Sequence, residues 1–181
     1  TVIKPATVEF VDIAGLVKGA SKGEGLGNQF LSHIRETAAI CHVLRAFTDP
    51  DIIREGAVEP SSDLAIIRTE LQLADLATLE KQREPKGAAS PEEKERWKTI
   101  LHFKQSLDQG LPLSWSSLTL AQKLVAQELC LLSAKPEIFA LNVDEAQVGD
   151  SGALIAEFAP KLKVKPDQII VISAKIESEL A

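Results

Sequence analysis

V-E-F-V-D-I-A-G, at residues 8–15, is a short β-branched apolar run that ends in an aspartate and a glycine. Such a run is typical of a buried strand that leads into a functional loop. Half of the ten glycines lie between residues 15 and 27, so this loop is expected to be flexible. Residues 29–39 have the apolar spacing of a helix, and residues 40–47 resemble a second buried strand. Strand, loop, helix and strand form a βαβ unit, which predicts an α/β fold with a mainly parallel sheet.

The middle of the chain has helical patterns instead. Apolar residues recur at three- and four-residue steps from residue 63 to residue 81, which predicts an amphipathic helix. S-P-E-E at residues 90–93 predicts the start of a second helix, and Gly110 predicts its end. A third helix is expected over residues 118–131. Residues 63–133 are therefore predicted to form an antiparallel helical insertion.

The α/β pattern then returns, with strands predicted at residues 137–141 and 169–172. Each strand leads directly into polar residues, which occupy positions 142–145 and 173–175. Ligands of open parallel sheets bind in the crevice at the carboxyl ends of the strands. These two segments and the one that begins at Asp12 are therefore the candidate ligand loops.

Asp12 and Gly15 could serve a bound phosphate. An aspartate at the end of a strand can hold Mg²⁺ through water, as a hard oxygen ligand. A glycine three residues later lets a backbone N–H approach a phosphate, because no Cβ stands in the way. The alternative is a capping aspartate with a turn glycine, since both residue types are common in turns.

The later loops could read a nucleobase. Asn142 offers an amide donor and an acceptor, and the carboxylates of Asp144 and Glu145 can accept from ring or exocyclic N–H groups. Ser173-Ala174-Lys175 offers small residues and backbone amides that could pack beside a base. A polar turn before a helix remains an equally good interpretation of residues 142–145 taken alone.

Composition limits the function classes. The 181 residues are 45% hydrophobic and 25% charged, with a net charge of −6, which is typical of a globular protein and disfavours DNA binding. No apolar run approaches the length of a membrane span, and no signal peptide is visible, so a cytoplasmic protein is expected. Cys41 and Cys130 are expected to be small buried groups in a reducing compartment.

Six stretches of the sequence are far more specific when they are taken together. They are T-V-E-F-V-D-I-A-G-L-V-K-G-A-S-K-G-E-G-L-G-N-Q-F-L (7–31), I-R-E-T (34–37), T-E-L-Q-L-A-D-L-A-T-L-E-K (69–81), A-K-P (134–136), N-V-D-E (142–145) and S-A-K-I-E (173–177). Together they closely resemble the Obg-like ATPase family, in its YchF subfamily of translation-factor-related P-loop NTPases. The resemblance covers nearly the whole chain and is weakest over residues 85–118.

The resemblance implies a partial Ras-like P-loop NTPase domain that binds ATP with Mg²⁺ and hydrolyses the ATP. Asp12 and Gly15 match the DxxG motif, which implies a place for Asp12 in the Mg²⁺ shell and a γ-phosphate contact for the amide of Gly15. Leu16 stands where many GTPases carry a catalytic glutamine, and an apolar residue cannot orient water. His33 is a candidate for that role, although a lone histidine on a helix is more often structural. Residues 19–27 resemble the mobile switch.

The resemblance also implies the base site and the partners. The N-V-D-E motif is associated with a preference for ATP over GTP, because the longer carboxylate of glutamate is misplaced for the two donors of guanine. The insertion resembles the family's coiled-coil arm, which is thought to contact partners, and implies a ribosome-associated protein. The expected base-site residues are Asn142, Val143, Glu145, Ser173, Ala174 and Lys175. The expected division is 1–62 and 134–181 for the nucleotide domain and 63–133 for the arm.

The sequence lacks several features of the family, including the motif that binds the phosphates. No G-x-x-x-x-G-K-[ST] motif, no switch threonine and no TGS domain are present in these residues, and the chain has no methionine. We therefore expect a fragment that binds ATP very weakly or not at all by calorimetry.

Two other functions remain open. A non-catalytic module could dock to a protein or the ribosome through the helical arm. A plain Mg²⁺-dependent phosphohydrolase is weaker, because Glu9 points away from Asp12 by strand alternation and supplies no second carboxylate.

Overall fold

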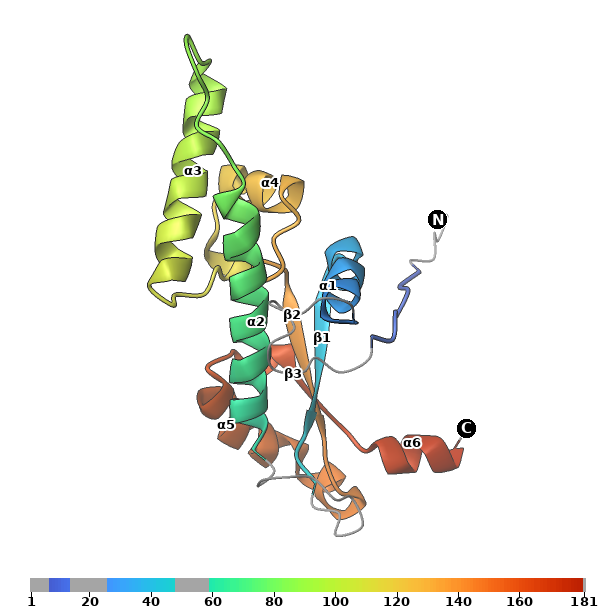
Figure 1. The fold of residues 1–181 in the computed structure, drawn as a ribbon. Coiled ribbons are helices and arrows are strands. Elements are labelled where there is room, and N and C mark those ends of the chain that lie inside the picture. The colour runs from blue at the N-terminus through green and yellow to red at the C-terminus, as the bar shows by residue number, and fades with distance from the viewer. Residues whose placement is uncertain (1–6, 14–25, 48–58, 181) are drawn as a thin grey trace, which may run out of the picture.

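A three-stranded parallel sheet in the order β1-β2-β3 lies at the centre of the computed structural model (Figure 1). The model describes residues 7–13, 26–47 and 59–180. The strands are β1 (Ile40–Arg45), β2 (Glu137–Asn142) and β3 (Ile169–Ile172). The predicted α/β fold with a parallel sheet is therefore confirmed.

Two helices, α2 (Pro60–Glu80) and α5 (Ser151–Leu162), cover one face of this sheet. The core between these helices and the sheet contains Leu44, Leu64, Phe139, Leu141, Val143, Ala159, Leu162 and Ile169. Alternate residues of the strands point to the opposite face, where Val43 is 67% exposed. Among the described residues, α2 and α5 thus pack on the same side of the sheet.

The helical insertion consists of the second half of α2, α3 (Pro91–Asp108) and α4 (Leu120–Glu128). It extends beyond one end of the sheet, with α3 beside α2 and α4 near the upper end of α2 (Figure 1). The predicted capping box is present, because the Ser90 side chain accepts from the Glu93 amide and the Glu93 side chain accepts from the Ser90 amide. Gly110 follows α3 with φ +70°, a conformation that favours glycine.

Shorter helices complete the described part of the fold. The α-helices are α1 (Leu26–Glu36) and α6 (Ala174–Leu180). The 3-10 helices are η1 (Trp115–Ser117), η2 (Glu145–Asp150) and η3 (Pro166–Gln168). None of the helices in the described residues has the length and apolar character needed to span a membrane.

Asp75 ties the helical insertion to the chain that enters β2. Its side chain, only 1% exposed, accepts hydrogen bonds from the amides of Leu132 and Ser133, both at 2.7 Å, and from Ser133 Oγ at 2.6 Å. Since a buried carboxylate needs donors, this turn and α2 stabilise each other.

A second polar network joins α2 to the sheet. Glu137, the first residue of β2, lies 2.9 Å from His42 Nε2, and its other oxygen accepts from Arg68 at 2.8 Å. Arg68 also donates to the carbonyl of Leu162 at 3.2 Å. The rings of His42 and Phe139 stack beside this network with centroids 5.2 Å apart.

The strand predicted over residues 8–11 is wrong. These residues are irregular and exposed, and Phe10 is 80% exposed. A strand exists only through hydrogen bonds to a neighbour, and β1 pairs with β2 alone within the described ranges. The predicted βαβ unit therefore does not form with this segment, although α1 leads into β1 as expected.

Both cysteines were expected to be buried, and both are exposed. Cys41 lies on the opposite face of β1 from the buried side chains of His42 and Leu44, and therefore points away from the core under α2 and α5. Cys130 lies in the turn after α4 with φ +50°.

Candidate functional site

The polar residues after β2 and β3 meet at the carboxyl edge of the sheet. Asn142 Oδ1 accepts a hydrogen bond from the amide of Ala174 at 2.9 Å. The amide of Val143 donates to the carbonyl of Ile172 at 2.9 Å. Asn142 and Ala174, which are 32 residues apart in sequence, are therefore fixed against each other, because the strands that they follow are neighbours.

An ion pair crosses the same edge. Glu145 Oε1 lies 2.5 Å from Lys175 Nζ, and both side chains are largely exposed. The side chain of Val143, in contrast, is buried in the core under α5, so Val143 faces the protein rather than the crevice. The acidic residue of N-V-D-E and the lysine of S-A-K thus act on each other directly.

Ser173 brings an unsatisfied hydroxyl to this edge. Of the buried side-chain nitrogen and oxygen atoms in the described residues, Ser173 Oγ and Arg45 Nε have no hydrogen-bond partner. Buried polar atoms without a partner are rare in proteins and can indicate a missing ligand. Ala174 and Lys175, expected in a loop, begin α6 instead.

The structure does not bring Asp12 to these loops. Asp12 is exposed in the irregular segment 7–13, and its neighbour Ile13 packs against the cluster of α1 and α2. This segment (blue in Figure 1) lies away from the carboxyl ends of the strands. Within the described ranges, no hydrogen bond or ion pair links Asp12 to Asn142 or Glu145.

The other phosphate-side candidates are only partly described. His33 is exposed on α1. Gly15, Leu16 and most of the glycine-rich loop lie outside the described residues. In the part of the chain that the structure describes, no group of three histidine, cysteine, aspartate or glutamate side chains could hold a metal ion.

Arg45 is a residue that the sequence interpretation missed. It ends β1, and its register partner in β2 is Asn142, so it lies at the same carboxyl edge. Its guanidinium carbon stands 4.8 Å from the centroid of the Phe47 ring. The available signal was a charged residue near the end of an otherwise apolar strand.

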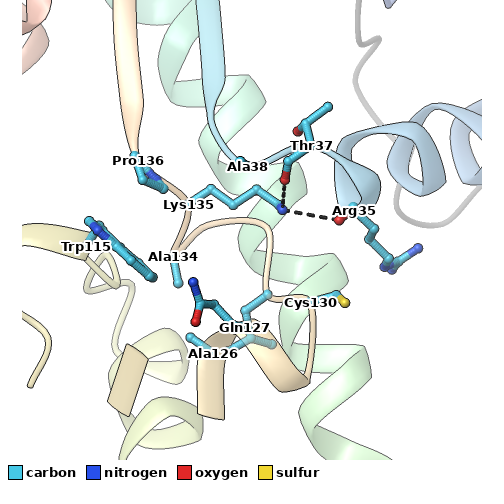
Figure 2. Close-up of a pocket in the computed structure, with 11 residues that line it drawn as sticks. Arg35, Thr37, Ala38, Trp115, Ala126, Gln127, Cys130, Ala134, Lys135 and Pro136 are labelled. Atoms are coloured by element: carbon cyan, nitrogen blue, oxygen red, sulfur yellow. Dashed lines mark hydrogen bonds between the residues drawn. The ribbon is translucent and has the colours of Figure 1, made fainter. Parts of the chain in front are cut away.

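A pocket of about 270 Å³ lies at the opposite edge of the sheet, before β2 (Figure 2). Trp115, Gln127 and Cys130 line it together with the end of α1. Lys135 Nζ donates to the carbonyls of Arg35, at 3.2 Å, and Thr37, which holds the C-terminal end of α1. Burial lowers the pKa of Lys135. This pocket is therefore separate from the base-site candidates.

Comparison with known proteins places the chain in a family. A family model described as "50S ribosome-binding GTPase" matches residues 1–70. The "Ribosome-binding ATPase YchF" of Bacillus subtilis is 42% identical over 187 residues, which cover 98% of this chain and 50% of that protein. The protein of the same name from Escherichia coli O157:H7 is 40% identical, with 98% and 50% covered. The chain belongs to the YchF family.

A solved structure of the family has the same fold. It is described as the YchF GTPase of Schizosaccharomyces pombe, with a TM-score of 0.67 and 35% identity over 92% of this chain and 48% of that one. The recognised resemblance is thereby confirmed. The YchF-family chain described here spans about half the length of the relatives it matches. The names of these relatives disagree on the nucleotide, since two say ATPase and one says GTPase.

Proposed function

We propose that residues 1–62 and 134–181 form part of the nucleotide domain of a cytoplasmic, ribosome-associated YchF-family NTPase, which binds ATP with Mg²⁺ and hydrolyses the ATP. Residues 63–133 are its helical arm. The single observation that carries the proposal is the junction of Asn142 and Ala174 at the carboxyl edge of the sheet. This edge is where open parallel sheets bind ligands.

The chemistry of this edge fits a nucleobase. Asn142 supplies amide donors, since its oxygen already accepts from Ala174, and the buried hydroxyl of Ser173 lacks a partner. Ring nitrogens and exocyclic groups of a purine can satisfy such atoms. Val143 supports the site from the core, and Ala174 holds Asn142 through its backbone.

The ion pair between Glu145 and Lys175 favours adenine over guanine. Guanine presents two N–H donors, which require a carboxylate oriented towards them. Glu145 is instead oriented towards Lys175 at 2.5 Å, so contact with guanine would have to disrupt that ion pair. This arrangement supports the ATPase assignment, rather than GTPase, for this chain.

Glu145→Asp is expected to shift the preference of the chain from ATP towards GTP by about tenfold, or ~1.4 kcal/mol. The aspartate is one methylene shorter, so it should leave Lys175 and accept from guanine. The measurement is a titration of the ¹⁵N-labelled chain with millimolar ATP or GTP, followed by the amide shifts of residues 142–145 and 173–175.

Glu157→Asp is the matched control for this experiment, because Glu157 is also a glutamate paired with a lysine, on α5 and away from the edge. It should leave both affinities unchanged. An unchanged ATP to GTP ratio in Glu145→Asp would place base selection elsewhere. Millimolar nucleotide is used because the expected affinity is too weak for calorimetry, and the absence of any amide shift with either nucleotide at that concentration would contradict the proposed function itself.

Asp12 would hold Mg²⁺ through water, Gly15 would contact the γ-phosphate, and His33, exposed on α1, would orient the attacking water. In Asp12→Ala, Mg²⁺ should no longer tighten ATP binding, a loss of about fivefold for one water-mediated contact. The same titration with and without Mg²⁺ measures it. The control is Glu9→Ala, which removes an exposed carboxylate from the same segment and should keep the full tightening of ATP binding by Mg²⁺. If Mg²⁺ tightens ATP binding equally in Asp12→Ala, Asp12 does not belong to the metal site.

A docking module is the second candidate, and exposed leucines on the helical arm favour it. Leu120 is 75% exposed, and Leu101, Leu111 and Leu124 are also exposed on α3, α4 and the segment between them. Large apolar side chains exposed on one part of a fold are candidates for a protein contact site. The two functions are compatible, because the leucines and the base-site edge belong to different parts of the fold.

A further inference from the structure

Arg45 lies beside the amide that the proposed function assigns to the base. Arg45 and Asn142 are register partners in neighbouring parallel strands, which stand about 4.8 Å apart. Their preceding residues, Leu44 and Leu141, both point into the core under the helices. Strand alternation therefore directs Arg45 and Asn142 to the same side of the sheet, opposite the core under α2 and α5.

The guanidinium of Arg45 has no acceptor in the part of the chain that the structure describes. Its Nε is buried and unpartnered, and no carboxylate or carbonyl of the described residues binds the group. Arg68 and Arg96, in contrast, each bind a glutamate. A buried donor that binds neither protein nor water is unfavourable by a full desolvation penalty.

Two further contacts hold Arg45 in this position. The ring of Phe47 lies under its guanidinium carbon at 4.8 Å, and the amide of Ala46 donates to the carbonyl of Asn142 at 2.8 Å. Asn142 Oδ1 already accepts from Ala174, and the Asn142 side chain adds two N–H donors. Arg45 and Asn142 therefore present donors side by side, which suits a ligand with acceptors on one edge.

We propose that Arg45 is a further base-binding residue, which donates a hydrogen bond to an acceptor nitrogen of the purine next to Asn142. The inference rests on the proposed function, because it assigns one more contact to the same nucleotide site. It adds that the base, rather than the phosphates, is the part of the nucleotide that Arg45 binds. A purine ring carries acceptor nitrogens on its edges and suits two adjacent donors.

Arg45→Gln and Arg45→Lys test this contact in the ¹⁵N-labelled chain. The probes are ATP, adenosine, which has no phosphate, and inorganic tripolyphosphate, which has no base. Arg45→Gln is expected to weaken the binding of ATP and of adenosine by the same factor, about tenfold, and to leave the binding of tripolyphosphate unchanged. Arg45→Lys keeps the charge but loses Nε, so it should bind ATP and adenosine as weakly as Arg45→Gln does. Arg96→Gln, on the helical arm, is the matched control and should bind all probes like the unsubstituted chain.

Three results would overturn the inference. The first is a loss confined to ATP and tripolyphosphate, which would make Arg45 a phosphate contact. The second is full recovery in Arg45→Lys, which would show that charge alone is sufficient. The third is an Arg45→Gln chain that has a native spectrum and binds adenosine as tightly as the unsubstituted chain does. In that case the inference about Arg45 fails, but the proposed function stands, because the unsubstituted chain still binds adenosine. If the unsubstituted chain binds no probe, the proposed function fails and the inference fails with it.

Discussion

Asp75→Ala is expected to lower the free energy of unfolding at pH 7 by about 3 kcal/mol. The substitution leaves the amides of Leu132 and Ser133 without their acceptor in a buried turn. That turn also leads to Lys135, which holds the end of α1. Urea denaturation measures the change. The control is Asp108→Ala, which replaces an exposed aspartate at the end of α3 and should change the free energy of unfolding by less than ~0.5 kcal/mol. A loss as small as this in Asp75→Ala would show that the hydrogen bonds between Asp75 and the turn do not stabilise the fold.

Asp75→Asn removes the titration of this group, at the cost of placing an NH₂ donor where one of the two oxygens accepts from an N–H group of the turn. Burial raises the pKa of Asp75 to about 6 from an ordinary value of 3.8, although hydrogen bonds from Ser133 and Leu132 and the charge of Arg35 act in the opposite direction. A raised pKa means that the folded state binds the proton more tightly, so this contribution is full below pH 3.8 and is lost as the pH rises through 6. Between pH 5 and pH 7 the unsubstituted chain should lose about 1 kcal/mol relative to Asp75→Asn.

Elements with strong local signals were predicted well from the sequence. The capping box at Ser90 and the left-handed glycine at position 110 fix both ends of α3 through contacts within a few residues. The apolar runs that form β2 and β3 contribute side chains to the core under α2 and α5, so their hydrophobicity correctly predicted buried strands.

Elements that depend on distant partners could not be predicted in the same way. Residues 8–11 have the composition of a strand, but composition does not specify the neighbouring strand that must supply hydrogen bonds. The exposure of Cys41 has a related origin, because alternation identifies two faces of β1 but not which of them a helix covers.

The candidate site was predicted in outline. Parallel strand order implied that residues 142–145 and 173–175 would meet, and the bond between Asn142 and Ala174 is the contact that realises it. The ion pair of Glu145 with Lys175 and the place of Arg45 beside Asn142 depend on register, which no single segment encodes. The separation of Asp12 from this edge follows from the missing strand at residues 8–11.

Glu137→Ala is expected to destabilise the fold by about 2–3 kcal/mol at pH 7. Among the described residues, it leaves the guanidinium of Arg68 with the carbonyl of Leu162 as hydrogen-bond acceptor and the ring of Phe139 as neighbour. It also removes the partner of His42, which is buried. Breaking one partner of a buried ion pair is strongly unfavourable, and the partial exposure of Glu137 reduces the effect somewhat. Urea denaturation again measures the change, and Glu157→Ala, which breaks an exposed pair with Lys161, should lose less than ~0.5 kcal/mol.

The pH dependence of this network is opposite in sign to that of Asp75. Burial tends to raise the pKa of Glu137, but hydrogen bonds from His42 and Arg68 outweigh it and hold the pKa below its ordinary value of 4.5. Its contribution is therefore present above pH 4.5 and is lost as the pH falls through the lowered pKa. Glu137→Ala should then lose stability relative to the unsubstituted chain at pH 7 and approach it at pH 3. A difference between the two chains that stays constant from pH 7 to pH 3 would show that Glu137 stabilises the sheet by packing rather than by charge.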